Sequence, residues 1–160
     1  SDIIWSKGNP MPESVTDRPT KAHEYIFLLS KSKKYFYDAD AIAEPVTNST
    51  INRLSQNIEE QAGSDRIPPK RNKRTVWNIN TKPYKEAHFA TFPPKLPEIC
   101  IKAGCPDGGT VLDPFAGAGT TLWVAERLGV NSIGIELNPE YCEIIRRRMA
   151  GLEANLFLAK

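Results

Sequence analysis

The stretch DPFAGAGTT, residues 113–121, constrains the fold of this chain more than any other feature. The apolar run 110–113 predicts a strand that leads into it, and residues 119–128 predict a helix that leaves it. Gly117 and Gly119 allow the backbone to turn tightly and let a ligand approach the main chain. A strand, a glycine turn and a helix in this order indicate an α/β unit whose ligand lies at the turn.

The elements around this unit continue the same alternation. Residues 95–103 predict a preceding helix, and residues 132–136 predict the next strand. A further helix is expected to begin after Asn138, which suits the cap position, with Pro139 in its first turn. The arginines at 146–148 are expected near the end of that helix, where its dipole favours cations. Strand–helix alternation of this kind predicts a parallel sheet.

The first half of the chain is less regular. Residues 2–5 predict a short strand, and residues 24–29 predict a buried strand that pairs with residues 35–38 as a hairpin. From about residue 44 to residue 74 the chain is polar and has no aromatic residue. A long polar segment of this kind predicts a loop or insert, because such loops are usually functional or disordered.

These observations predict one structural domain with three regions. We expect the catalytic region and its hairpin in 1–43, a target-recognition insert in 44–75, and the cofactor-binding region in 76–160. The insert ends in the run Lys70-Arg71-Asn72-Lys73-Arg74, which packs four cations into five positions. Such a run can neutralise phosphates, although a solvated loop explains it equally well.

The acidic residue Glu136 points to the kind of ligand. It ends the predicted strand 132–136 and lies 19 residues after Gly117, where a carboxylate can accept hydrogen bonds from both ribose hydroxyls of a nucleoside. A dinucleotide fingerprint would place a third glycine where Leu122 stands, and a phosphate loop would place a lysine after Gly119. A cofactor with adenosine and no phosphate, S-adenosylmethionine, fits better. A glycine-rich turn with a structural role remains an alternative.

Composition excludes other classes. No apolar run approaches the ~20 residues that span a bilayer, and the N-terminus has no secretory signal, so a cytoplasmic protein with no membrane partner is expected. The three cysteines, Cys100, Cys105 and Cys142, are odd in number, and Cys100 and Cys105 are too far apart for a zinc knuckle. We therefore expect reduced thiols and no metal site.

Several segments together resemble the amino-group DNA methyltransferases of restriction-modification systems, which modify adenine N6 or cytosine N4. The order of the segments resembles the subgroup in which catalytic segments precede cofactor segments. The matching segments are DPFAGAGT (113–120), HFATFPPKL (88–96), IELNPEYCEIIRRRM (135–149), and WSKGNPMPES, RPTKAHEYIFLLSKS and YFYD within residues 5–38.

This resemblance implies an α/β fold, the Rossmann-like sheet of S-adenosylmethionine-dependent methyltransferases, here incomplete and with an antiparallel hairpin. It implies double-stranded DNA as the partner and S-adenosylmethionine as the cofactor. The residues that it places at the cofactor are Asp113, Phe115, Gly117, Gly119, Thr120 and Glu136, with His88, Phe89, Thr91 and Phe92 near the methionine end. DNA contacts are expected from Lys70, Arg71, Lys73 and Arg74.

One departure from the family pattern concerns catalysis. The family's catalytic motif is a polar residue, Pro-Pro and an aromatic residue, whereas Pro68-Pro69 and Pro93-Pro94 have neither neighbour. No catalytic residue is therefore assigned, and the chain is expected to be a fragment or one piece of a split enzyme that needs an N-terminal segment or second chain. The strand that carries the motif would lie between residues 110–113 and 2–5. We expect an open or partner-filled edge beside 110–113.

Three alternatives stay open at this point. The chain could be an inactive remnant that binds cofactor or DNA, a nucleotide-dependent oxidoreductase, or an RNA or protein methyltransferase with the same cofactor motif. Methylation assays and cofactor titrations separate them.

Overall fold

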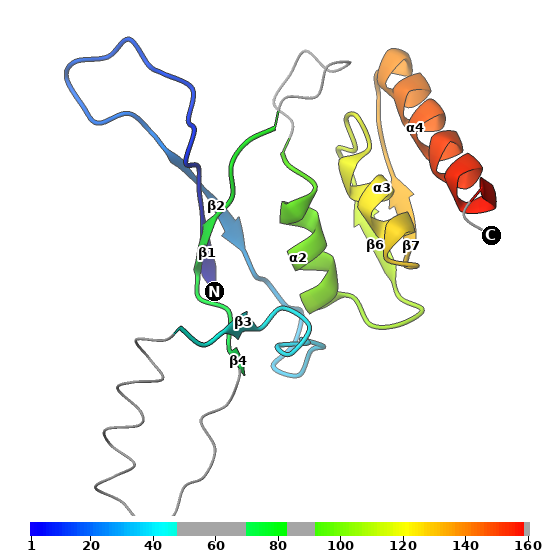
Figure 1. Cartoon of the computed structure of the whole chain (residues 1–160), viewed down its shortest axis with the longest axis horizontal. Coiled ribbons are helices and arrows are strands. Elements are labelled where there is room, and N and C mark those ends of the chain that lie inside the picture. Colours follow the sequence, from blue (N-terminus) through cyan, green and yellow to red (C-terminus); the bar gives the residue numbers. More distant parts are fainter. Residues whose placement is uncertain (48–69, 83–91, 159–160) are drawn as a thin grey trace, which may run out of the picture.

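The computed structural model describes residues 1–47, 70–82 and 92–158. Figure 1 shows strands at one side, a central helix, and a second group of strands and helices at the other side. The elements in chain order are β1 (Asp2–Ser6), β2 (His23–Phe27), β3 (Glu44–Pro45), β4 (Lys70–Arg71), β5 (Val76–Asn78), α2 (Lys95–Gly104), β6 (Thr110–Asp113), α3 (Thr120–Arg127), β7 (Asn131–Gly134) and α4 (Pro139–Leu158).

The hairpin exists, but its two strands differ from those predicted. β1 pairs antiparallel with β2, with Ile3 opposite Ile26, and β5 pairs parallel with β1. The prediction that residues 35–38 form the partner strand is wrong, because β1 already occupies one edge of β2 over five register pairs. Residues 35–38 instead follow a loop that the N–H of Asp38 attaches to the carbonyl of Ala103 at 2.8 Å. The parallel strand β5 was not predicted.

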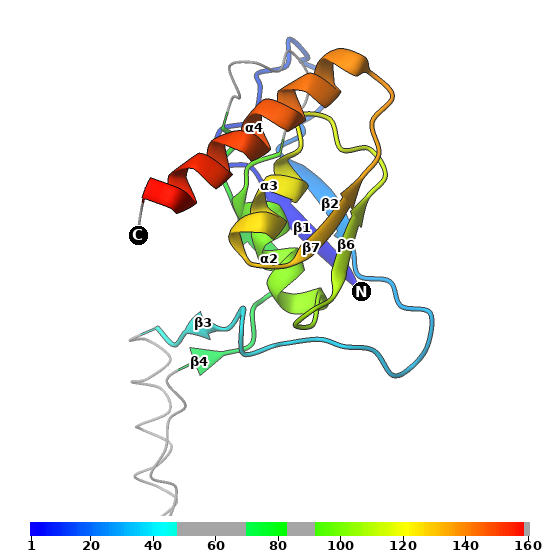
Figure 2. The ribbon, with the colours of Figure 1, turned by 90° about the vertical axis from the view of Figure 1, so that its right-hand side faces the viewer.

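The second half follows the predicted alternation closely. β6 and β7 pair in parallel, with Leu112 opposite Ile133, and α3 crosses between them. The side chain of Asn138 caps α4 by accepting a hydrogen bond from the N–H of Glu140 at 2.9 Å. The prediction that the arginines at 146–148 lie near the end of this helix is wrong, because α4 continues to Leu158. Figure 2 shows α4 crossing over α3 along its length.

Helix α2 sits between the two groups of strands, and opposite sides of it are buried. Ile99 and Ala103 pack with Ile42 and Trp77 beneath the β2-β1-β5 sheet. Ile101, two positions from each of them, packs instead against Val124 and Ala125 of α3. Residues two apart point to nearly opposite sides of a helix, so α2 joins both clusters into one body.

The sheets remain separate within the described residues. The strand orders are β2-β1-β5, β3-β4 and β6-β7, so β6 has a strand partner on one side only in this part of the chain. The expected open edge beside 110–113 is therefore present. The expectation that β1 lies across the gap is wrong, because β2 and β5 occupy both of its edges. The strand with a free edge facing the gap is β2.

No helix among the described residues is long and apolar enough to cross a membrane. Most of the predicted recognition insert, 44–75, lies outside the described residues, and its separation from the other two regions stays a prediction.

Candidate cofactor site

The glycine turn between β6 and α3 is held at both ends. Its first residue, Asp113, accepts the N–H of Phe115 at 3.1 Å through its carboxylate and the N–H of Ile135 at 2.9 Å through its carbonyl. Gly117 and Gly119 have φ angles of +51° and +75°, which side-chain-bearing residues rarely adopt. A Cβ at Gly119 would stand 2.8 Å from Cγ1 of Ile145, so this turn also requires glycine sterically.

Glu136 closes the turn from the neighbouring strand end. Its Oε2 accepts the N–H of Gly117 at 2.8 Å, and its Oε1 accepts the N–H of Asn138 at 2.8 Å. These backbone hydrogen bonds, that of Asn138 foremost, lower the pKa of Glu136 below its usual 4.5. Each carboxylate oxygen accepts one backbone N–H here and keeps further lone-pair capacity for a ligand hydroxyl.

Thr120 does not present its hydroxyl to the turn. Its side chain is buried at 7% exposure, and its Oγ1 accepts a hydrogen bond from the guanidinium of Arg148 at 3.2 Å. Arg148 also donates to the carbonyl of Ala118 at 3.0 Å and lies over the ring of Trp123. A contact between Thr120 and a cofactor would therefore use its backbone. Sequence reasoning missed Arg148, which looked like one of three equivalent surface arginines.

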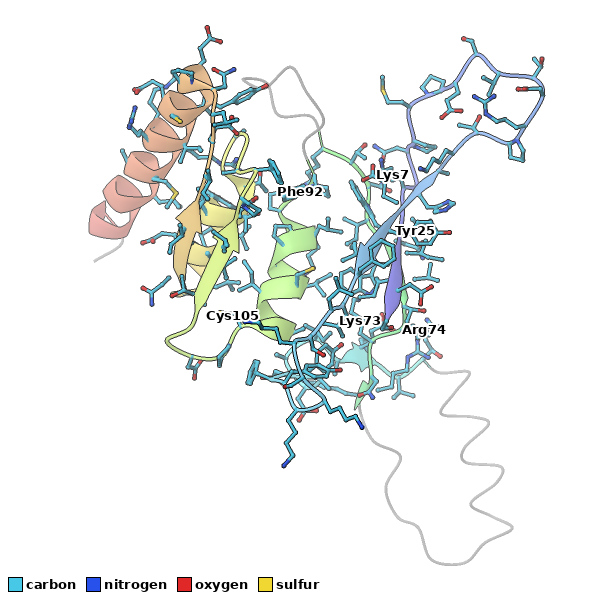
Figure 3. The ribbon with its side chains drawn as sticks, turned by 180° about the vertical axis from the view of Figure 1, so that it is seen from behind. Lys7, Tyr25, Lys73, Arg74, Phe92 and Cys105 are labelled. Carbon is cyan, nitrogen blue, oxygen red and sulfur yellow. The ribbon has the colours of Figure 1, made fainter. Side chains whose placement is uncertain are left out.

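The aromatic residues of the predicted site occupy different surroundings. Phe115 is 87% exposed on the outside of the glycine turn. Phe92 lies just before α2, as Figure 3 shows, and lines the same cavity as Thr121 of α3. His88, Phe89 and Thr91 lie outside the described residues, so their predicted places near the methionine end stay predictions.

The basic run converges on one acidic side chain. The carboxylate of Glu44 lies 3.2 Å from Lys73, 3.5 Å from Arg71 and 3.6 Å from Arg74. Burial alone would raise the pKa of Glu44, but the hydrogen bond from Lys73 and the three nearby charges lower it. Lys73 is largely covered and lies over the ring of Trp77. Lys70 is exposed and Arg74 is 69% exposed, so these two cations are the accessible ones of the run.

The cofactor turn and the basic run stand at opposite ends of the strands. In Figure 1, β3 and β4 lie at the lower end, whereas the turn between β6 and α3 lies at the upper end. The structure thus brings Asp113, Gly117 and Glu136 together and separates them from the predicted DNA-contacting residues. DNA contacts from this run stay a prediction.

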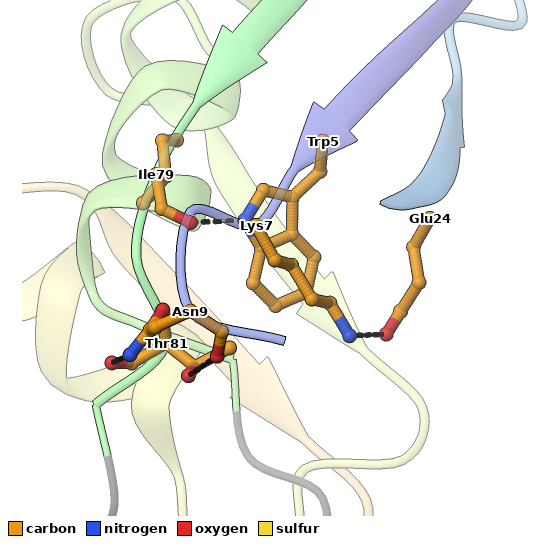
Figure 4. Close-up of polar contacts among 6 residues, drawn as sticks. All are labelled: Trp5, Lys7, Asn9, Glu24, Ile79 and Thr81. Carbon is orange, nitrogen blue, oxygen red and sulfur yellow. Dashed lines mark hydrogen bonds and ion pairs between the residues drawn. The ribbon is translucent and has the colours of Figure 1, made fainter. Parts of the chain in front are cut away.

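A second junction, which sequence reasoning missed, lies where β1 and β5 end. The ring N–H of Trp5 donates to the carbonyl of Ile79 at 2.7 Å, and Lys7 forms an ion pair with Glu24 (Figure 4). One residue pair further, Asn9 accepts the N–H of Thr81 at 2.9 Å and donates to its carbonyl at 3.2 Å. These bonds fix the start of the loop that connects β1 and β2 to the segment that follows β5.

Comparison with known proteins decides the family. Residues 1–147 match the DNA methylase family of N6- and N4-methyltransferases. The chain belongs to this family. It is 48% identical over 149 residues to the Type II methyltransferase M.SmaI of Serratia marcescens, covering 93% of this chain and 45% of that protein. It is 47% identical to the Type II methyltransferase M.Cfr9I of Citrobacter freundii, covering 98% of this chain and 46% of that protein.

Solved methylase structures show the same fold. PvuII DNA methyltransferase, described as cytosine-N4-specific, superimposes with a TM-score of 0.66 at 24% identity, over 92% of this chain and 49% of that one. A putative DNA modification methylase from Thermus thermophilus, complexed with S-adenosyl-L-methionine, superimposes with a TM-score of 0.54 at 27% identity, over 93% and 51%. The methylase chain thus has the Rossmann-like methyltransferase fold, with an incomplete sheet and an antiparallel hairpin. It spans about half the length of the proteins it matches.

Proposed function

We propose that this methylase chain is the S-adenosylmethionine-binding part of an enzyme that methylates the exocyclic amino group of adenine (N6) or cytosine (N4) in DNA. The observation that carries the proposal is the carboxylate of Glu136, fixed at 2.8 Å from the N–H of Gly117 at the open end of the β6–β7 pair. Ligands of parallel sheets bind at this end of the strands. Because its substrate would be cellular DNA, we place the reaction in the cytoplasm.

Each residue of the turn has a proposed task. Glu136 would accept the two ribose hydroxyls through the lone pairs that its backbone hydrogen bonds leave available. Gly117 and Gly119 would let the cofactor lie against the main chain, and Asp113 would hold the start of the turn in place. Phe115, the backbone of Thr120 and the segment with His88, Phe89, Thr91 and Phe92 would complete the pocket.

The proposed reaction needs no covalent enzyme intermediate. When bound, S-adenosylmethionine supplies the methyl group that the target amino nitrogen attacks in line. The residues of this chain would orient and hold the reactants, and orientation alone can contribute ~7–11 kcal/mol. The groups that accept the amino protons and stack on the flipped base would come from a Pro-Pro-aromatic motif outside these 160 residues.

The proposed DNA contacts are uneven across the basic run. Lys70 and Arg74 are the cations free to reach phosphates, since Lys73 and Arg71 are more covered and lie against Glu44. We therefore assign direct phosphate contact to the first pair and support of the β3–β4 ribbon to the second.

Two measurements test the proposal. Calorimetry with S-adenosylmethionine and, in parallel, with NAD should give binding of the first only; binding of NAD alone would favour an oxidoreductase. Transfer of a labelled methyl group to DNA should be absent for the chain alone and present when the part of M.SmaI that this chain does not match is supplied. Methylation by the chain alone would overturn the assignment of the catalytic motif to another segment.

A further inference from the structure

An apolar cavity of about 610 Å³ lies between the two groups of strands. One wall comes from α2, through Leu96 and Cys100, and the others come from Ile26 of β2 and Val111 of β6. The cavity therefore lies in the gap where the free edge of β2 faces the free edge of β6.

The edge of β6 that borders this cavity has unpaired backbone groups. The carbonyl of Asp113 accepts the N–H of Ile135 on the β7 side. N–H and C=O groups point to alternate sides along a strand, so those of Leu112 point away from β7 and toward the gap. Among the described residues they have no strand partner there. Unpaired backbone groups beside an apolar cavity favour the addition of another strand.

The outer faces of both sheets are also uncovered and apolar. In the β6–β7 pair, Leu112 and Ile133 stand side by side at 59% and 56% exposure. On the other sheet, Tyr25, Phe27 and Val76 are 53%, 64% and 49% exposed. The opposite faces pack on α2 and α3. Exposed apolar patches of this kind on both sheets mark a surface that another polypeptide covers.

We propose that a separate apolar segment inserts at least one β-strand between β2 and β6, which joins the two sheets into one. The occupant is the portion of the longer methylase that this chain does not include, since the chain covers only 45% and 46% of its two relatives M.SmaI and M.Cfr9I. Following strands and helices of that portion cover the outer apolar faces. The identity of the segment rests on the proposed function, whereas the docking itself does not.

The test uses this chain and, as the probe, a tagged polypeptide with the part of M.SmaI that this chain does not match. Co-expression should yield a one-to-one complex, and hydrogen exchange should show new protection at the amide of Leu112. Leu112→Pro removes that N–H but leaves the β6–β7 bonds, because proline is tolerated where a strand N–H faces outward. It should weaken the complex about tenfold or more, whereas Leu112→Ala, which keeps the N–H, should weaken it less.

Circular dichroism of each variant checks that it folds, and Cys100→Trp provides a second block, because Cys100 is exposed and lines the cavity. Failure to capture the probe, capture without protection of β6, or self-association of the chain through this edge would each overturn the docking proposal. Capture with protection at Leu112 but without methylation would support docking and contradict the proposed function instead.

Discussion

Replacement of Glu136 by alanine tests the cofactor site directly. The carboxylate holds the N–H groups of Gly117 and Asn138, each at 2.8 Å, and would also accept the ribose hydroxyls. Hydrogen bonds to a charged group contribute about 1.5–3 kcal/mol. Loss of the ribose hydrogen bonds should therefore weaken S-adenosylmethionine binding roughly ten- to a hundredfold.

The assay is calorimetric titration of the folded chain, with and without the captured M.SmaI portion. Glu140→Ala is the matched control, because it removes the same charge two residues into the α4 region, where the side chain is exposed. It should leave the affinity unchanged. Equal affinities for Glu136→Ala, Glu140→Ala and the unaltered chain would refute the ribose assignment.

The pH dependence gives an independent check. The pKa of Glu136 is lowered by the backbone hydrogen bonds from Asn138 and Gly117, so the carboxylate stays charged below its ordinary pKa of 4.5. A lowered folded pKa means that the stabilisation is present above 4.5 and is lost as the pH falls through the folded value. Cofactor affinity should therefore stay flat from neutral pH to about pH 5. A loss of affinity that begins near pH 6 would point to another group.

Three further predictions follow from the packing and charges. Gly119→Ala should lower the free energy of unfolding by about 2–4 kcal/mol, whereas Gly129→Ala, with a similar φ of +69° and no atom near the added Cβ, should cost about 1 kcal/mol; equal melting temperatures would contradict the steric argument. Glu44→Gln should cost about 1–2 kcal/mol at pH 7, and the difference in urea unfolding should vanish as the pH falls well below 4.5. In the assembled enzyme, neutralising Lys70 and Arg74 should flatten the logarithmic salt dependence of DNA binding by about 0.9 for each phosphate that is no longer neutralised, and an unchanged slope would leave this run as a solvated loop.

The local elements of the second half were predictable because their signals are local. The glycines that require a positive φ, the cap at Asn138 and the apolar run of β6 act within a few residues of themselves. The 19-residue spacing from Gly117 to Glu136 likewise follows from the length of one helix and one strand. The family and its cofactor motif could therefore be inferred from the sequence.

Only the tertiary structure decided which segments pair. The run 35–38 has strand-like residues, yet β2 takes β1 as its partner, because long-range pairing depends on which edges meet in space. The same reason explains the missed strand β5, which is three residues long and acquires its structure from β1.

Charge and polarity at the site also depended on distant contacts. The sequence determined that four cations crowd residues 70–74 and that Thr120 follows the glycine turn. Glu44, 29 residues before Lys73, is what engages most of those cations, and Arg148 is what buries the hydroxyl of Thr120. A side chain's partner across tens of residues is set by how helices and strands pack, which local sequence patterns do not encode.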